Sequence, residues 1–88
     1  MSMKDEFENI VEKLKTSRDE INLKLHLASM ELKDEFNEAE KQWVVVKAKA
    51  DEIADDTKET SEEFIAKAKI VGEELKDTYH RIARRLSE

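Results

Sequence analysis

Two histidines, a few serines and many carboxylates are the residues of this chain that could take part in catalysis. A nucleophilic serine needs an imidazole base beside it and a carboxylate that orients the base, and it usually lies in a recognisable local motif. No such motif surrounds Ser17, Ser29 or Ser61, and His26 and His80 lie far apart in the sequence. We therefore predict that the protein is not an enzyme.

Glu73, Asp77 and His80 have a spacing that would allow two or three of them to bind one metal ion. Metal sites in helical bundles use side chains that point between the helices. The inward positions of this segment are those of Leu75 and Tyr79, so Asp77 and His80 should point outward. The chain has no cysteine, which excludes disulfides and thiolate metal sites. We predict no metal and no cofactor.

The segment 51–63 is rich in carboxylates but lacks the interior glycine and alternating ligands of an EF-hand calcium loop. It has two interpretations. It is either a solvated turn or an acidic surface that docks a basic partner, as in a small inhibitor that imitates DNA phosphates. The candidate docking residues are Asp51, Asp55, Asp56, Glu59 and Glu63.

A basic stretch near the end of the sequence contains Lys76, Arg81, Arg84 and Arg85. Cations in the last turns of a helix stabilise its dipole, which is the structural interpretation. The functional interpretation is an amphipathic helix that binds peripherally to lipid.

The composition favours helices. Of 88 residues, 43% are charged, one is glycine and none is proline, so the usual turn residues of sheets are nearly absent. The net charge of −6 argues against general binding to nucleic acid. No apolar stretch approaches the roughly 18 residues of a membrane span, and the first residues lack the apolar core of a secretory signal. We therefore expect a cytoplasmic protein without a membrane span.

Apolar residues recur every three or four positions, which is typical of amphipathic α-helices. This pattern predicts an all-α protein, with long amphipathic helices in a coiled-coil-like hairpin or bundle that is completed by oligomerisation. We expect one domain over residues 1–88, with helices over 4–55 and 61–86. The segment between them is either a turn or continuous helix. Because Ser17 and Glu20 have the spacing of a capping box, a break near 16–18 is a further option.

Apolar and polar residues alternate strictly from Ile21 to Leu27, which alone would indicate a strand. The flanking residues favour helix. In a helix, Leu23, Leu27 and Met30 lie opposite Ile21 and Leu25, which makes the segment apolar on two faces. Such a helix should contact more than one neighbour, so we expect at least three helices to pack together.

A hairpin of two helices would leave the apolar positions between Phe7 and Leu32 uncovered. A second copy of the chain would cover them, so we predict a homo-oligomer, most simply a dimer. The alternative is a monomer in which a short first helix folds back. The predicted interface residues are Ile21, Leu25, Leu32, Phe36, Trp43, Val46, Ile53, Phe64, Val71, Leu75 and Tyr79.

The stretches Leu23–Trp43 and Val71–Tyr79 resemble short, uncharacterised bacterial coiled-coil proteins. The resemblance implies helices and no known activity, so no functional residue is carried over from it. We predict a non-catalytic structural or protein-interaction module, whose partner is a second copy or another protein. The acidic docking protein and the peripheral lipid-binding protein are the alternatives.

Overall fold

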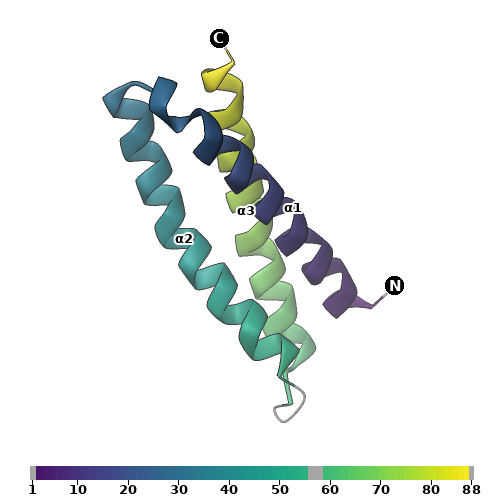
Figure 1. The fold of residues 1–88 in the computed structure, drawn as a ribbon. Coiled ribbons are helices and arrows are strands. Elements are labelled where there is room, and N and C mark those ends of the chain that lie inside the picture. Colours follow the sequence, from purple (N-terminus) through teal and green to yellow (C-terminus); the bar gives the residue numbers. More distant parts are fainter. Residues whose placement is uncertain (1, 56–58, 88) are drawn as a thin grey trace.

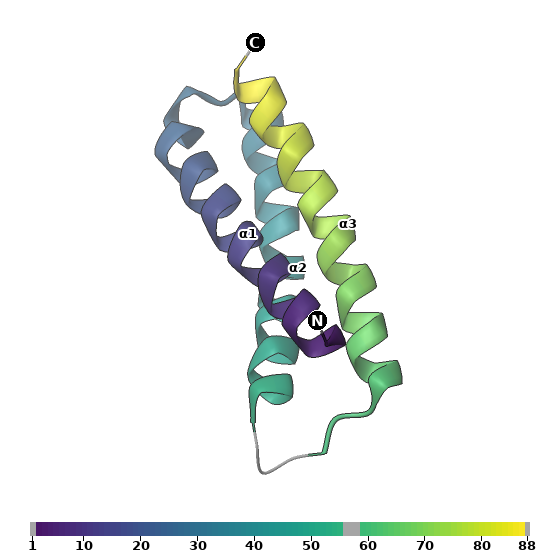
Figure 2. The same ribbon diagram turned by 90° about the vertical axis from the view of Figure 1, so that its right-hand side faces the viewer.

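The computed structural model describes residues 2–55 and 59–87. These residues form three α-helices, α1 (Met3–Lys24), α2 (Met30–Ala54) and α3 (Glu62–Leu86), and a short 3-10 helix, η1 (Leu25–Leu27). Helix α1 and helix α3 run in the same direction, and α2 runs antiparallel to both (Figures 1 and 2). The predicted all-α bundle of long amphipathic helices is confirmed.

A serine stands before each α-helix and satisfies one of the N–H groups that the first turn leaves free. Each serine Oγ accepts a hydrogen bond from the backbone N–H three residues later, in the pairs Ser2–Asp5, Ser29–Leu32 and Ser61–Phe64. Acidic residues in the first turns, such as Glu31 and Glu62, complement the positive end of the helix dipole. The chain thus uses two of its candidate nucleophiles, Ser29 and Ser61, to begin helices.

The helix is interrupted at residues 25–29, where η1 and the extended backbone of Ala28 and Ser29 separate α1 from α2. The prediction of one helix over 4–55 is therefore wrong. The sequence does not indicate this break, because Ile21, Leu25 and Leu32 keep the spacing of three or four residues per turn that is typical of a continuous α-helix. Neither glycine nor proline marks the position.

The break considered near residues 16–18 does not occur, since α1 continues through them. Arg18 occupies an apolar position of the stripe, but its guanidinium pairs with Glu40 and lies over the ring of Trp43. The helix therefore accommodates this charge without interruption.

The sequence favours a turn over continuous helix between the predicted helices 4–55 and 61–86, and the bounds of α2 and α3 decide against continuous helix. Helix α2 ends at Ala54, Asp55 has extended backbone angles, and α3 begins at Glu62. Continuous helix across this segment is thereby excluded. Residues 56–58, which include the candidate docking residue Asp56, lie outside the described residues.

The apolar stripe is buried within a single chain. Helix α1 folds back and packs along α3, and this covers the positions that a two-helix hairpin would leave in water. The argument that a second copy must cover the stretch from Phe7 to Leu32 is therefore wrong. A first helix folds back, as in the alternative, but α1 has 22 residues and is not the short helix expected there. The buried residues are Phe7, Val11, Leu14, Ile21, Leu32, Phe36, Ala39, Trp43, Val46, Ile53, Ile65, Ala68, Leu75, Tyr79 and Ile82.

The most extensive contact between helices is that of α1 with α3. Gly72 is buried in this contact, against side chains from the first half of α1. A Cβ atom at this position would lie 3.0 Å from Cγ2 of Ile10 and 3.8 Å from Cε1 of Phe7. The absence of a side chain at Gly72 thus allows the backbones of α1 and α3 to approach closely.

Candidate interaction surface

A polar cluster connects the three helices at mid-height. The guanidinium of Arg18 on α1 donates from Nε and Nη2 to the two carboxylate oxygens of Glu40 on α2, each at 2.7 Å. The hydroxyl of Tyr79 on α3 donates to the same carboxylate over 3.4 Å. The Arg18 guanidinium also lies 5.4 Å from the ring centroid of Trp43. Glu40 therefore receives donors from both neighbouring helices.

The electrostatics of this cluster suit packing better than proton transfer. The hydrogen bond to Glu40 raises the pKa of Arg18 further above its already high value. Burial, followed by the charge of Glu40, raises the pKa of Tyr79 above its ordinary value of 10.0. Arg18 therefore stays protonated and Tyr79 stays neutral at physiological pH, so neither can act as a general base there.

Two further ion pairs join helices at the bundle surface. Glu6 and Lys69 link α1 to α3 at 2.8 Å, and Glu35 and Arg85 link α2 to α3 at 2.7 Å. The hydrogen bond from Lys69 lowers the pKa of Glu6. Because these side chains remain partly exposed, such pairs contribute little stability and mainly fix the register of the helices.

The two histidines lie on separate parts of the surface. His26 is exposed in η1, whereas His80 lies on α3, beside a shallow hollow of about 550 Å³ that also involves Lys13, Ser17 and Lys76. Across residues 2–55 and 59–87, no group of three histidine or carboxylate side chains is arranged to hold a metal ion. This includes the sequence candidates Glu73, Asp77 and His80.

Two of the candidate acidic docking residues form ion pairs within their own helices. Asp51 pairs with Lys47 and faces the groove between α1 and α2. Glu63 pairs with Lys67 on α3. Asp51 and Glu63 thus each have a cation from their own helix beside them.

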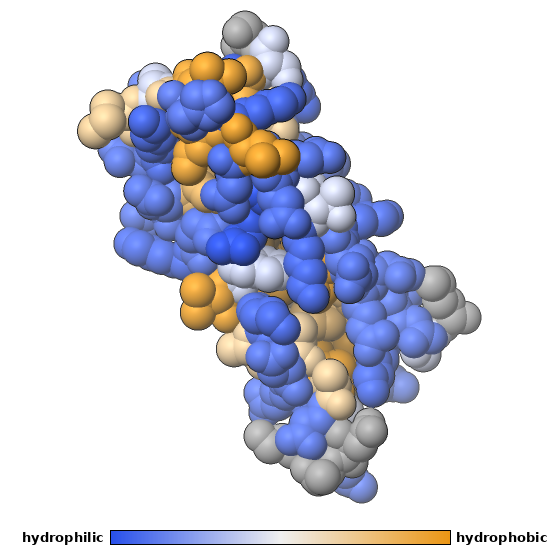
Figure 3. All heavy atoms as spheres, viewed as in Figure 1, coloured by the Kyte–Doolittle hydropathy of each residue, from blue (hydrophilic) through white to orange (hydrophobic). Residues whose placement is uncertain are grey.

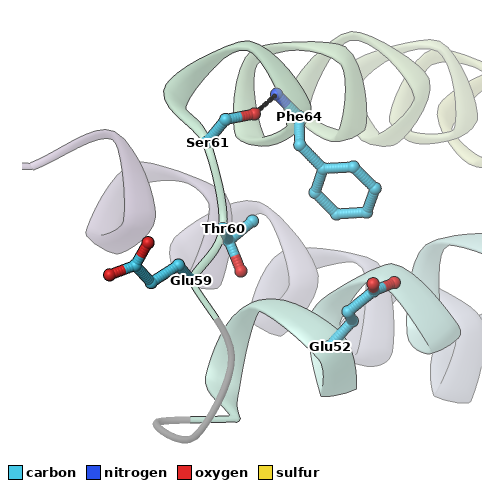
Figure 4. Close-up of a pocket in the computed structure, with 5 residues that line it drawn as sticks. All are labelled: Glu52, Glu59, Thr60, Ser61 and Phe64. Atoms are coloured by element: carbon cyan, nitrogen blue, oxygen red, sulfur yellow. Dashed lines mark hydrogen bonds between the residues drawn. The ribbon is translucent and has the colours of Figure 1, made fainter.

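A second hollow, of about 480 Å³, lies beside the connection between α2 and α3. Glu52 and Phe64 face it from the two helices, while the carboxylate of Glu59 points away (Figure 4). Lys49 lies 4.9 Å from the ring centroid of Phe64 and covers that ring from α2. The hollow is open to solvent, and the carboxylate of Glu59 does not point into it together with that of Glu52.

Large exposed apolar side chains gather at the opposite end of the bundle, where α1 passes through η1 into α2. Leu23, Leu27 and Met30 are 76%, 69% and 74% exposed. We call these three residues the apolar tip. Figure 3 shows hydrophobic atoms at the surface of this end of the molecule. The prediction that they lie opposite the core-facing residues is confirmed, but the second neighbouring helix expected to cover them is not found among the described helices.

The predicted interface residues lie in the intramolecular core. Most are buried, and Leu25, Phe64 and Val71 are partly buried against the same core. They form contacts between helices of one chain and are not available to a second copy. Sequence periodicity identifies side chains that must be covered, but it does not show whether the covering helix belongs to the same chain.

Sequence reasoning did not predict the exposed apolar side chains outside the tip. Val44 and Val45 are exposed half-way along α2, and Ile70 is 57% exposed on α3. For Val44 and Val45, the run of β-branched residues after Trp43 was the feature of the sequence that could have indicated exposed apolar side chains. Ile70 had no signal, since single exposed apolar residues are common on protein surfaces.

Comparison of the chain with protein-family models, curated proteins and solved structures finds no match. Within the described ranges, each helix is too short or too polar to span a membrane.

Proposed function

We propose that this protein is a non-catalytic protein-interaction module that binds its partner through the apolar tip. The observation that carries the proposal is the exposure of Leu23, Leu27 and Met30 together, on a bundle that encloses its remaining apolar stripe. Soluble monomers rarely expose large contiguous apolar patches, and the largest such patch on a monomer is often functional. The cytoplasmic location stays a prediction from the sequence.

The backbone that presents the apolar tip is held by the core. Leu25 and Ala28 alternate with the exposed residues and pack against the buried cluster. Ser29 caps α2 immediately before Met30. A partner would therefore meet side chains on an ordered backbone, which reduces the conformational entropy lost on binding.

A non-catalytic role is supported by the way the polar side chains are used. Ser29 and Ser61 cap helices, and the Glu40 carboxylate is already hydrogen-bonded to Arg18 and Tyr79. His26 is exposed and distant in sequence from the groove beside His80. Ser17 and His80 line the same hollow, but no hydrogen bond joins them in the described residues.

The acidic docking and lipid-binding alternatives have less support. Asp51 and Glu63 pair with lysines of their own helices, which reduces the negative field that a basic partner would meet. In the basic stretch of α3, Arg85 pairs with Glu35 of α2 and is only partly exposed. Both surfaces are therefore partly occupied by contacts within the chain.

Site-specific photo-crosslinking in cells tests the proposal. A photoreactive phenylalanine derivative is placed at position 27 in the apolar tip or, as a matched control, at the exposed apolar position 70. We expect a covalent protein adduct through position 27 and none, or much less, through position 70. Absence of any adduct through position 27 would contradict the proposed function.

A further inference from the structure

The interruption between α1 and α2 depends on the backbone of two residues, Ala28 and Ser29, which we call the hinge. Ala28 has φ −78° and ψ 149°, and Ser29 has φ −66° and ψ 163°. Both φ angles are already close to the helical value of about −63°, so only the ψ angles depart from helix. The segments on either side, η1 and α2, are helical. Rotation about two ψ angles would therefore join α1 and α2 into one helix.

The sequence around the hinge suits such a joined helix. Alanine is the best helix former, and neither glycine nor proline stands nearby. Ile21, Leu25, Ala28 and Leu32 follow one another at steps of four, three and four, so the apolar stripe of α1 would continue on the same face of α2. A helix that only folds back does not need this register, because a loop can reset it. Joining the helices would also give partners to backbone groups that two helix ends leave free.

We propose that the hinge allows domain swapping, in which two copies of this chain exchange their α1 helices. The monomer itself shows what would cover the apolar face of α3 in the dimer, since α1 packs there with Ile10 and Phe7 against Gly72. In the monomer these faces are enclosed, and they become available to a second copy only when α1 leaves α3. The inference goes beyond the proposed function, because it uses the contact of α1 with α3 and not the apolar tip.

The directions of the helices are compatible with the exchange. In one chain α1 and α3 run in the same direction and α2 runs antiparallel to both (Figures 1 and 2). A two-fold axis at the hinge would place the joined helices of two copies antiparallel to each other. Helix α1 of each copy then runs in the same direction as α3 of the other, as it does within one chain. Because both copies are satisfied equally, the exchange ends at a closed dimer.

The swapped dimer repeats the helix contacts of two monomers. It differs from them in the backbone of the hinge and in the entropy lost on association, so its population should depend on both the hinge and the protein concentration. Its shape also differs. A joined helix from Met3 to Ala54 would be roughly 80 Å long at 1.5 Å per residue. The longest dimension of the described part of the monomer is 43 Å.

Refolding over a concentration series tests the exchange. The chain is unfolded in urea and refolded at each concentration, so that α1 can choose between α3 of its own copy and α3 of another. Sedimentation velocity should show monomer at low concentration and an increasing fraction of dimer at high concentration. X-ray scattering should give the dimer a maximum dimension of roughly 80 Å. A chain that stays monomeric at all concentrations would overturn the proposal.

Two substitutions should shift the dimer population in opposite directions. Met30→Pro suits the monomer, because Met30 is the first residue of α2 and follows an extended residue. In the joined helix this proline would remove a hydrogen bond and clash with the preceding turn, so the dimer should be lost. Ser29→Ala removes the Oγ that caps α2 in the monomer. It should lower the dissociation constant about tenfold or more, since each dimer contains two hinges.

Met30→Ala is the matched control for Met30→Pro. It removes the same exposed side chain from the apolar tip, but its backbone can still form the joined helix, so its dimer should persist. If Met30→Ala lost the dimer as completely as Met30→Pro, the pairing would use the tip, and the exchange would be overturned. Circular dichroism establishes that the variants keep their helicity.

Cross-linking between two variants identifies the exchanged helix. The chain has no cysteine, and Glu6 of α1 forms an ion pair with Lys69 of α3. A Glu6→Cys copy and a Lys69→Cys copy are mixed, unfolded and refolded together. A short bismaleimide should join the two different copies after concentrated refolding and not after dilute refolding. A dimer without this product would overturn the proposal, because its α1 would not lie on α3 of the other copy.

Discussion

Glu40 is the side chain at which the three helices meet, since it accepts hydrogen bonds from Arg18 and Tyr79. We expect Glu40→Ala to lower the free energy of unfolding by about 1–3 kcal/mol, because a partly buried guanidinium loses its carboxylate. Urea denaturation followed by circular dichroism measures this. Glu38→Ala is the control: its pair with Lys41 is solvent-exposed, so the change should stay within about 0.5 kcal/mol. Equal losses in the two variants would contradict the role of Glu40.

Tyr79 is the only tyrosine, so its titration can be followed by the ultraviolet absorbance of the phenolate. Burial raises the pKa of Tyr79 above 10.0, its ordinary value. The resulting stability is fully present below pH 10 and is lost as pH rises beyond it, because the unfolded chain releases the proton more readily. We expect phenolate absorbance to appear only with unfolding.

Tyr79→Phe is the control for this pH dependence. The stability of this variant should decline less steeply above pH 10 than that of the wild type, since only lysines still titrate there. A phenol that titrates near pH 10 while the helices remain folded would show that Tyr79 is not buried as described.

At the residue scale, the sequence predicted which side chains avoid water but not how the polar ones pair. In the sequence, Arg18 is visible only as a charge in an apolar position, beside the capping-box spacing of Ser17 and Glu20 that suggested a helix break. Its partner, Glu40, belongs to another helix, and single-sequence spacing carries no information on that contact. For the same reason the serines appeared as possible nucleophiles, whereas two of them are helix caps.

At the scale of the elements, the helical class and the turn before α3 followed from periodicity and from a run of polar residues. The break at residues 25–29 did not, because no glycine or proline marks it. Its signal was the alternation from Ile21 to Leu27, which we interpreted as a helix with two apolar faces. The physical cause of the break is a chain reversal that allows α1 to pack on α3, and this tertiary contact outweighs local helix propensity.

Gly72 determines how closely α1 approaches α3. We expect Gly72→Leu to lower the free energy of unfolding by about 2–3 kcal/mol, because its side chain would overlap Ile10 and Phe7. Chemical denaturation measures the loss. In the control Gly72→Ala, the better helix propensity of about 1 kcal/mol offsets the tighter contact with Ile10, so the change should be smaller. A Gly72→Leu variant as stable as the wild type would show that the contact is not tight.

At the scale of the whole molecule, the core is complete within one chain. We therefore expect helicity and the midpoint of thermal unfolding to be nearly independent of protein concentration. Circular dichroism over a dilution series checks this. If helicity fell steeply on dilution, the buried stripe would have to be shared between copies, as the sequence alone had suggested.

The pairing of α1 with α3 also has a consequence for biosynthesis. The ribosome completes α1 at Lys24, but its main partner ends at Leu86. At about 5–20 residues per second, roughly 3 to 12 seconds separate these two events. During that time the apolar face of α1 can pack only against α2. Nascent chains should therefore be clients of a trigger-type chaperone, and compaction should occur late in translation.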